Sequence, residues 1–228
     1  MDGNKDLITI IYCSSCMENP GFEQRIQENL LKVCGDLPIV SVTQKPMNLG
    51  KNICVGDDIG VTGFNFFRQS LLACLEAKTK FVISAEADCM YPPSYFEWIP
   101  PKENICYRNS NLYVMPDYRD YFFHKPEGAT HAQIVGREFY IKILKKLFEG
   151  APMWSKEEKN FPKERWRKED VFDKNQIEYY ETKEPVFQTK THKSMRYYTR
   201  SERIPIYSLP YWGEGKKMRP YLIHGKII

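Results

Sequence analysis

The sequence predicts an α/β fold, with a mostly parallel, Rossmann-like sheet flanked by helices and then an irregular, basic second half. Three observations predict this class. Short apolar runs alternate with amphipathic segments along the first 85 residues, the order that parallel strands with right-handed crossovers produce. A polar, glycine-rich stretch interrupts the alternation at residues 44–63. After Pro92 and Pro93 the pattern changes to short strands and turns.

The elements of the first half follow from local patterns, taken here in chain order. Residues 7–12 (LITIIY) are continuously apolar, as in a strand that is buried on both faces. Residues 22–33 repeat apolar side chains at helical spacing, and 38–42 form a second short strand. Helical spacing returns over residues 64–77, and the apolar run 81–85 (FVISA) predicts a third buried strand.

The ends of these strands predict where the functional site lies. In an open parallel sheet, ligands bind beyond the carboxyl ends of the strands. Residues 12–15, 41–44 and 86–88 all fall there. The polar stretch after the second strand, which contains Asn48 and Gly50, is typical of a working loop rather than a linker.

The second half is less regular. Strands are expected at 105–107, 112–115 and 186–189, and helices at 137–148 and 170–180. No internal repeat or low-complexity tract separates the two halves. We therefore expect residues 1–228 to form one composite domain.

The composition of the 228 residues excludes several protein classes. Hydrophobic residues make up 42% and charged residues 27%, so the chain can bury a core, unlike a disordered tail or a collagen-like fibre. No apolar run approaches the ~20 residues of a membrane span. The amino terminus lacks the basic and apolar regions of a signal peptide. We therefore expect a soluble cytoplasmic protein.

Charge is distributed unevenly along the chain. Residues 1–136 hold 12 Lys and Arg against 16 Asp and Glu, whereas residues 137–228 hold 21 against 13. The acidic first part favours a cation site there, and the basic second part favours an anionic partner. A solvated, lysine-rich surface is the alternative explanation.

All seven cysteines lie in the first half, and an odd number without a secretion signal indicates reduced thiols. Cys13 and Cys16 form the only CxxC motif, whereas a zinc ribbon needs two pairs. A redox dithiol would require a lowered thiol pKa. Because Asn19, Pro20 and Gly21 separate Cys16 from the predicted helix, unreactive thiols are the alternative.

The strongest chemical motif is a pair of carboxylates, Glu86 and Asp88, directly after the apolar run 81–85. Two acids at the end of a buried strand cannot both lie in the core. Their oxygens are ligands that Mg²⁺ and Mn²⁺ prefer, and such a cation can bridge a diphosphate. Alternatively they cap the next helix, where Ser94 and Glu97 already offer capping groups.

Several motifs, in this order, resemble the nucleotide-sugar glycosyltransferases of the GT-A fold, especially the family 2-like group. The matches are Asn48 and Gly50 to an Asn-x-Gly element, Arg68-Gln69 to an Arg-Asn element, and Glu86-Ala87-Asp88 to the Asp-x-Asp signature. The family fold is an α/β nucleotide-binding half followed by an acceptor half. The resemblance therefore implies a donor- and metal-binding half at 1–100 and an acceptor-binding and catalytic half at 101–228.

The resemblance implies roles for the matched residues. Asp88 would hold Mn²⁺ or Mg²⁺ against the diphosphate of a nucleotide-sugar donor, expected to be a UDP-sugar. Glu86 would contact the metal through water or bind the ribose. The residues implied to bind the donor are Tyr12, Ser14, Asn48, Gly50, Arg68 and Glu86. Residues 41–44 contain no acid of the kind that reads uracil in the family, so the base is left open.

Two further matches lie in the second half. Residues 128–132, with Thr130 and His131, resemble the segment that faces donor sugar and acceptor. The segment from Trp166 to Asp170 resembles the Glu-Asp motif of inverting members, which implies Asp170 as catalytic base and Glu169 as the alternate. Such a base deprotonates the acceptor hydroxyl while a metal stabilises the leaving diphosphate. Alternatively, the two acids only stabilise a helix N-terminus.

Three ring-bearing residues complete the implied site. His192 matches a third metal ligand of some GT-A enzymes, and His224 is the competing candidate. A surface histidine is the alternative for His192. Residues 211–215 resemble a glycine-hinged flap that would stack Trp212 on a sugar, the alternative being a buried aromatic at a turn.

Together these features predict a metal-dependent, inverting glycosyltransferase. The basic half, with Trp166 and Arg196 among its aromatic and cationic residues, would suit an anionic acceptor such as a hydroxymethylated pyrimidine in DNA. The alternative acceptors are a saccharide, a lipid-linked sugar and a protein. The rivals are a non-catalytic nucleic-acid-binding module and a CxxC oxidoreductase. Neither rival explains why Glu86 and Asp88 end a buried strand.

Overall fold

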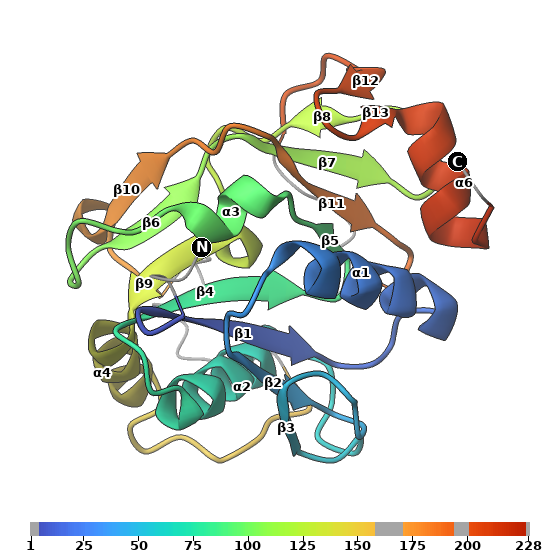
Figure 1. Ribbon diagram of the computed structural model, residues 1–228. Helices are drawn as coiled ribbons and strands as arrows, with labels where there is room; N and C mark the ends of the chain where they lie inside the picture. Colours follow the sequence, from blue (N-terminus) through green and yellow to red (C-terminus); the bar gives the residue numbers. More distant parts are fainter. Residues whose placement is uncertain (1–4, 158–170, 194–200, 227–228) are drawn as a thin grey trace.

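The computed structural model describes residues 5–157, 171–193 and 201–226. Its main feature is a seven-stranded sheet with helices on both faces, beside a smaller four-stranded sheet (Figure 1). Across the main sheet the strands lie in the order β10 (Ile177–Tyr180), β6 (Cys106–Asn109), β9 (Gln133–Gly136), β4 (Phe81–Glu86), β1 (Ile8–Ser14), β2 (Ile39–Thr43) and β3 (Lys51–Cys54). The order in the smaller sheet is β5 (Cys89–Met90), β11 (Val186–Lys190), β7 (Leu112–Pro116) and β8 (Phe123–His124).

The helices pack on opposite faces of the main sheet (Figure 1). Helices α1 (Pro20–Val33) and α3 (Pro93–Glu97) cover one face, and α2 (Gly63–Glu76) and α4 (Arg137–Leu147) cover the other. Helix α6 (Gly215–His224) lies against α1, next to the smaller sheet. A short hairpin of β12 (208–209) and β13 (213–214) precedes α6.

Strands β1, β2, β3 and β4 are parallel, so their carboxyl ends meet at one edge of the sheet. Ser14 at the end of β1 pairs with Thr43 of β2, and Cys13 pairs with Glu86 of β4. Strand β9 runs antiparallel to both β4 and β6. The expected α/β class with a mostly parallel sheet is thus confirmed, and the edge predicted to hold the site exists.

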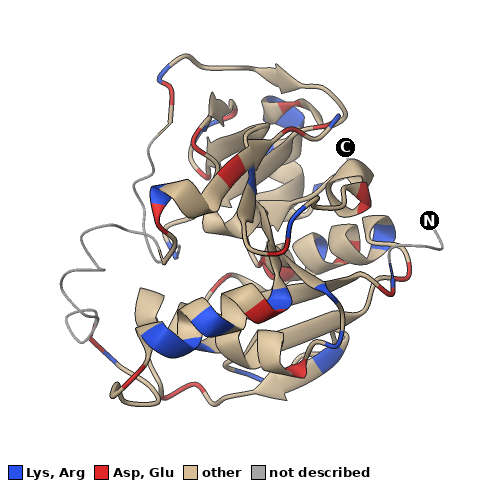
Figure 2. Ribbon diagram, turned by 90° about the vertical axis from the view of Figure 1, so that its left-hand side faces the viewer, with Lys and Arg blue, Asp and Glu red and all other residues tan. Residues whose placement is uncertain are grey.

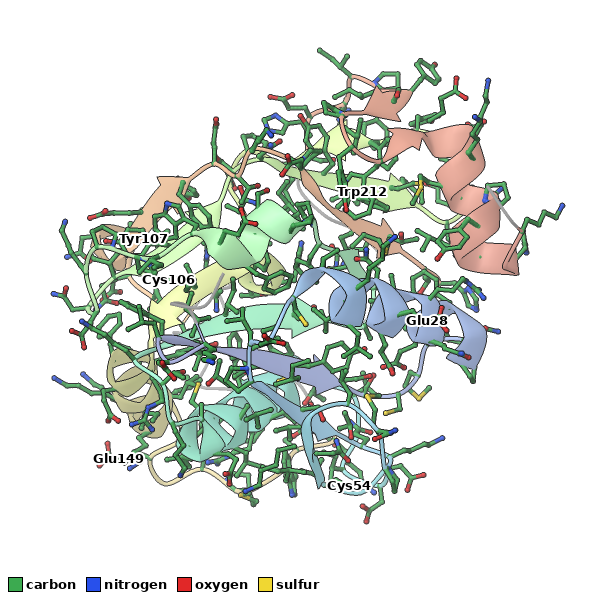
Figure 3. All side chains as sticks on the ribbon, viewed as in Figure 1. Glu28, Cys54, Cys106, Tyr107, Glu149 and Trp212 are labelled. Carbon is green, nitrogen blue, oxygen red and sulfur yellow. The ribbon has the colours of Figure 1, made fainter. Side chains whose placement is uncertain are left out.

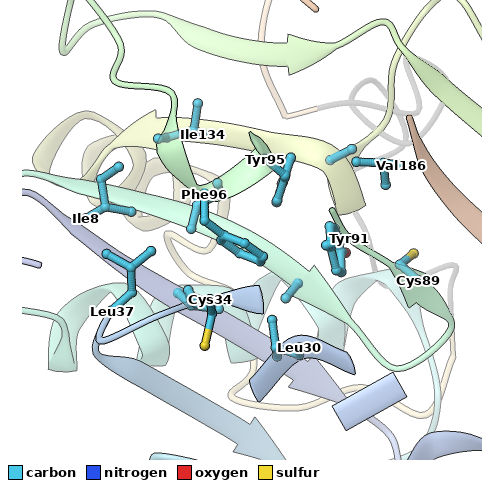
Figure 4. Close-up of a cluster of buried hydrophobic side chains, with 14 of the residues drawn as sticks. Ile8, Leu30, Cys34, Leu37, Cys89, Tyr91, Tyr95, Phe96, Ile134 and Val186 are labelled. Atoms are coloured by element: carbon cyan, nitrogen blue, oxygen red, sulfur yellow. The ribbon is translucent and has the colours of Figure 1, made fainter. Parts of the chain in front are cut away.

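The core is made of hydrophobic clusters on the two faces of the main sheet. Ile8 of β1 joins the cluster under α1 and α3, whereas Ile11 joins the cluster under α2 and α4. Figure 4 shows the first cluster, which contains Tyr95 and Phe96 of α3 together with Leu30 of α1. Each large side chain buried in this way contributes about 1.5–3 kcal/mol. Burial on both faces explains why the sequence of β1 is apolar without interruption.

Helix α1 begins two residues earlier than its apolar spacing predicts. The Asn19 side chain accepts hydrogen bonds from the backbone N–H groups of Gly21 (3.0 Å) and Phe22 (3.3 Å). Pro20 occupies the first turn, where its missing N–H needs no partner. The segment expected to separate Cys16 from the helix therefore starts the helix instead.

The second half is more regular than its sequence pattern predicts. The expected strands at 105–107, 112–115 and 186–189 and the helix at 137–148 are confirmed as β6, β7, β11 and α4. The helix expected at 170–180 is wrong in its described part, which forms a 3₁₀ turn (Lys174–Gln176) and strand β10. The sequence of helix α6 does not repeat apolar residues clearly at helical spacing, because Gly215 and Pro220 interrupt the pattern. The sequence pattern therefore does not predict this helix. Strand β3 lies within the stretch expected to be a loop.

Asn48 and Gly50 lie at the amino ends of the strands, opposite the predicted site. Gly50 directly precedes β3, whose first residue pairs with Val40 near the start of β2. A Cβ on Gly50 would lie 2.3 Å from the Ile39 carbonyl oxygen, and its φ is +59°. The donor-binding role expected for Asn48 and Gly50 is therefore wrong. Gly50 instead permits the close approach of two backbones.

Gly50→Ala is expected to destabilise the protein strongly, because a clash adds to the ~1–2 kcal/mol strain of a left-handed alanine. Gly150→Ala is the matched control: its φ is +71°, and among the described residues no heavy atom comes within 4 Å of a Cβ built there. Urea unfolding should show a loss of more than ~3 kcal/mol for Gly50→Ala and a much smaller one for Gly150→Ala. Equal losses would contradict the clash.

Candidate functional site

A cavity of about 100 Å³ lies at the carboxyl ends of β1, β2 and β4, where the parallel topology predicts a site. Ser14 ends β1, Gln44 follows β2, and Glu86 and Asp88 end and follow β4. All four line the cavity, together with two amide side chains from α2. The structure thus brings together Ser14, Glu86 and Asp88, which the sequence analysis assigned to one site.

The two amides from α2 hold this edge of the sheet together. Gln69 Nε2 donates to the carbonyl oxygens of Ser14 (3.1 Å) and Val42 (2.9 Å), and so connects β1 with β2. Asn65 Nδ2 donates to the Ile59 carbonyl oxygen (2.8 Å) in the preceding loop. Leaving such a buried carbonyl without its partner costs about 1–3 kcal/mol. The sequence patterns did not assign Asn65 to the site.

Glu86 carries a buried oxygen at the end of β4. Its backbone N–H donates to the Tyr91 hydroxyl (3.1 Å), which donates to the His131 carbonyl oxygen (2.7 Å). Among the described residues, Glu86 Oε1 has no hydrogen-bond partner. Burial raises the pKa of Glu86 to about 8, with a further rise from Asp88 and an opposing effect from Lys190. A cation beside this carboxyl group would restore its charged form.

Asp88 is buried and is held by the smaller sheet. Its Oδ2 accepts a hydrogen bond from Gln188 Nε2 (2.9 Å), and its Oδ1 accepts one from the Cys89 thiol (3.2 Å). Its backbone oxygen accepts from the Thr189 N–H (2.7 Å). Gln188 and Thr189 belong to β11, so residues 100 positions apart fix the orientation of this carboxylate.

Further carboxylates add negative charge around the cavity. Glu18 lines the cavity, and Asp117 follows β7. Glu23 of α1 accepts a hydrogen bond from Tyr12 of β1. Burial raises the pKa of Glu18 to about 7, the Thr191 hydroxyl opposes the rise, and the charges of Asp88, Glu23 and Asp117 add to it. Grouped carboxylates of this kind attract a cation. The sequence analysis missed Glu18, although an acid between the first strand and the cap of the next helix is a usable signal.

The oxygens at this edge suit a hard divalent cation with few protein ligands. Glu86 and Asp88 supply carboxylate oxygens of the kind that Mg²⁺ and Mn²⁺ bind. Within the described ranges, no group of three His, Cys, Asp or Glu side chains is arranged to hold a metal ion. A cation bound here would take its remaining ligands from a bound phosphate group or from water, as Mg²⁺ commonly does.

Without metal, the protein is expected to lose stability as the pH rises from about 4.5 to about 8. The folded protein keeps a proton on Glu86 that the unfolded chain releases above the ordinary pKa of 4.5. The proton on Glu86 therefore contributes its full stabilisation below about pH 4.5. It contributes none above the pKa of about 8 that Glu86 has in the folded protein. In thermal melts in chelator, Glu86→Gln should reduce this loss of stability but not abolish it, because the raised pKa of Glu18 acts in the same direction. Glu97→Gln, which alters an exposed acid of α3, should keep the profile of the wild type. An unchanged profile in Glu86→Gln would contradict the burial of this charge.

Tyr12 and Arg68 hold the structure together instead of lining the cavity. Tyr12 is fully buried, and its hydroxyl donates to Glu23 Oε1 (2.9 Å). The Arg68 guanidinium donates to the carbonyl oxygens of Pro152 (2.6 Å) and Met153 (3.0 Å), and so fastens that segment to α2. The donor-binding roles expected for Tyr12 and Arg68 are therefore wrong.

His192, His224 and Trp212 are not among the residues that line the first cavity. The two histidines line a second cavity of about 520 Å³, where His192 Nδ1 lies 3.6 Å from Asp117 Oδ2. The third-ligand role of His192, and that of its competitor His224, stays a prediction. Trp212 lies over the smaller sheet (Figure 3) and donates from Nε1 to the Pro185 carbonyl oxygen (2.6 Å). Trp212 is thus a half-buried aromatic at a turn, which agrees with the alternative interpretation of this residue.

Thr130 and His131 occupy a short 3₁₀ turn before β9. Burial lowers the pKa of His131 well below 6.5, and Lys190, Lys125 and Arg108 act in the same direction. Its ring is therefore neutral at physiological pH. Acceptor binding by Thr130 and His131 stays a prediction. Four other candidates lie outside the described residues: Trp166, Glu169, Asp170 and Arg196.

The CxxC motif does not have the electrostatics of a redox site. Cys13 is buried in β1, and burial raises the pKa of its thiol to about 12. A redox dithiol needs the opposite shift, because the thiolate is the reactive species. The structure therefore favours the unreactive alternative for Cys13.

Basic residues are exposed on α4, which faces the viewer in Figure 2. Lys142, Lys145 and Lys146 are exposed there, on the side of the main sheet opposite α1. This part of the positive charge is thus a solvated helix face. In the part of the chain that the structure describes, no helix has the length and apolar character needed to cross a bilayer.

Comparison with known proteins gives similarity of fold. No family model and no curated protein matches the sequence. The glycosyltransferase GlyE of Streptococcus pneumoniae TIGR4 is 11% identical at a TM-score of 0.47, over 77% of this chain and 45% of GlyE. TarS 1-349 of S. aureus, solved with UDP-GlcNAc, is 10% identical at 0.47, over 85% of this chain and 62% of TarS 1-349. The inositol-1-phosphate CTP transferase of T. maritima is 9% identical at a TM-score of 0.44, over 85% of this chain and 93% of that protein. This chain spans less than two thirds of the first two proteins, and its α/β fold is distantly similar to the GT-A-type fold of such transferases.

Proposed function

We propose that this protein is a metal-dependent, inverting glycosyltransferase that moves a sugar from a nucleotide-sugar donor to an acceptor hydroxyl. One observation carries the proposal: two carboxylates, Glu86 and Asp88, meet in a cavity at the carboxyl ends of parallel strands, and Glu86 Oε1 has no partner among the described residues. A buried carboxyl oxygen without a hydrogen-bond partner is expected at a site where a bound ligand or cation supplies that partner.

In this proposal Glu86 and Asp88 hold Mn²⁺ or Mg²⁺, which offsets charge on the leaving diphosphate. The chain itself supplies the orientation. Gln188 fixes one oxygen of Asp88, and Ser14 and Gln44 offer polar groups on the nucleotide side of the cavity. We expect a UDP-sugar as donor.

The proton leaves the acceptor hydroxyl for a carboxylate, for which we propose Asp170 with Glu169 as the alternate. The acceptor side would include Thr130, His131 and the basic, aromatic segments around residues 166 and 196. A hydroxymethylated pyrimidine in DNA and a saccharide are the two acceptor classes that such a surface suggests.

A thermal-shift panel of nucleoside diphosphates and nucleotide sugars, with Mn²⁺ and with chelator, tests the proposal. A ligand at a hundred times its dissociation constant stabilises by about 2.7 kcal/mol. For a chain of this size that raises the melting temperature by about 5–10 °C. The shift should require metal and should prefer one base.

The absence of a shift with every nucleotide would overturn the donor site. It would favour the rival function, a nucleic-acid-binding module that uses the basic half. That rival predicts DNA affinity that falls steeply with salt and that is unaffected by the loss of Asp88 or Asp170. Filter binding at several salt concentrations, with both variants, separates the two functions.

A further inference from the structure

The second cavity, of about 520 Å³, lies between the first turn of α1, the segment after β11 and the end of α6. Arg25 of α1 fixes this arrangement, because its Nε and Nη2 both donate to the Leu222 carbonyl oxygen of α6 (3.0 and 2.6 Å). Figure 1 shows the two helices side by side. A volume of this size falls within the roughly 300–1,000 Å³ of small-ligand pockets.

The lining of the second cavity combines apolar and hydrogen-bonding surfaces. Phe22 and Ile223 belong to the apolar cluster between α1, α6 and the smaller sheet. Opposing them are hydrogen-bonding side chains, among them the carboxylates of Glu18 and Asp117 and the ring of His192. The cavity therefore offers an apolar contact together with several acceptors for hydroxyl protons.

The carboxylates of this cavity are held in place before any ligand binds. The Thr191 hydroxyl lies 2.8 Å from both carboxylate oxygens of Glu18. Asp117 Oδ2 accepts from the His192 backbone N–H (3.1 Å), and the Asp117 N–H donates to the Lys190 carbonyl oxygen (2.9 Å). A preformed wall of this kind lowers the cost of ordering on binding.

The two cavities are neighbours, because Glu18 and Lys193 line both of them. Glu18 therefore stands between the Glu86 and Asp88 pair and the second cavity. A ligand in the second cavity would therefore adjoin the donor site at Glu18. It would not contact Asn65 and Gln69 of α2, which line the first cavity but not the second.

We propose that the second cavity is the acceptor subsite and that its ligand is a neutral sugar ring. The proposal rests on the proposed function and narrows its acceptor class. A sugar presents C–H groups on its faces, which pack on Ile223 and on the exposed side chain of Met17, and hydroxyl groups at its edges. Those hydroxyls donate to Asp117, and to Glu18 in its ionised form, in charge-assisted hydrogen bonds. A phosphate group would meet these two carboxylates against a single cation among the described lining residues, Lys193, so repulsion would outweigh attraction.

The histidines provide the test, because the chain has only four. His192 and His224 line the second cavity, whereas His124 belongs to strand β8 and His131 to the 3₁₀ turn before β9. Imidazole proton signals can be followed by NMR in nucleotide-free protein during titration with methyl glycosides of glucose, galactose, mannose and N-acetylglucosamine. Oligothymidylate is titrated as the anionic probe.

At least one glycoside is expected to shift the His192 and His224 signals saturably, with a millimolar dissociation constant, and to leave the His124 signal in place. Asp117→Asn should weaken this binding about tenfold or more, the loss expected for one charged hydrogen bond. Ile223→Trp should abolish it by filling the cavity. Leu31→Trp, on an exposed position of α1, is the matched control and should bind normally.

Two results would overturn the proposal: no glycoside moves the two signals, or oligothymidylate moves them more than any glycoside does. The titration contains no nucleotide or metal, so its failure is distinct from failure of the donor site. A protein that binds UDP with Mn²⁺ but no glycoside would keep the proposed function and lose this subsite. Because Asp117→Asn preserves side-chain shape, the proposal stays testable even if Ile223→Trp does not fold.

Discussion

Asp88→Ala is expected to abolish metal-dependent nucleotide binding. The substitution removes one of the two carboxylates at the end of β4 and leaves the Gln188 amide without its bond to Oδ2. The remaining Glu86 has a raised pKa, so it is a poor ligand on its own. Thermal-shift titration with UDP and Mn²⁺ should therefore lose the whole stabilisation of about 5–10 °C that is expected for the wild type.

Two variants control for indirect effects on Asp88. Asp88→Asn keeps the shape and the neighbouring hydrogen-bonding groups but removes the charge, and it should also lose metal-dependent binding. Asp57→Ala removes an exposed acid from the loop before α2 and should bind as the wild type does. Undiminished binding by Asp88→Ala would show that the cation, if bound, lies elsewhere.

Asp170→Asn is expected to remove sugar transfer while leaving donor binding intact. A general base contributes about 10²–10⁴-fold to the rate, and its amide cannot accept the acceptor proton. The measurement is the release of nucleoside diphosphate from the donor, followed alongside the thermal shift with the same donor. A large loss of rate with an unchanged shift would separate catalysis from binding.

Glu169→Gln is the neighbouring control for Asp170. If Asp170 is the base, Glu169→Gln keeps most of the activity; if the roles are exchanged, the two variants exchange their effects. Normal transfer by both variants would remove this motif from the mechanism. It would leave Glu18, which separates the two cavities, as the next carboxylate to substitute.

The first half of the fold could be predicted from the sequence because its signals are local. Strand β1 and helix α2 start within about two residues of their predicted bounds, since periodicity and flanking polar residues specify them over a few turns. Strand β10 could not be predicted in this way. Only one of its four residues, Tyr180, is buried, and its partner β6 lies about 70 residues earlier. Such a strand forms because a neighbour pairs with it.

The site could be predicted in part for a similar reason. Glu86 and Asp88 follow a strand that is buried on both faces, so their place at its end is fixed by the sequence pattern. Tyr12 and Arg68 have the right position along the chain, but their side chains turn into the core and toward residues 152–153. The direction of a side chain depends on tertiary packing, which one sequence does not reveal. The bond from Gln188 to Asp88 spans 100 residues and is invisible for the same reason.

The antiparallel position of β9 has a consequence for any attempt to divide the chain after residue 100. Strand β9 comes from the later residues, yet it lies between β4 and β6 and pairs with Phe81, Val82 and Ile83. A fragment that ended at residue 100 would expose that side of β4 as an unpaired, apolar edge. Unprotected edges of this kind recruit strands from other molecules. Such a fragment should therefore self-associate rather than remain a monomeric nucleotide-binding unit, and size-exclusion chromatography would show it.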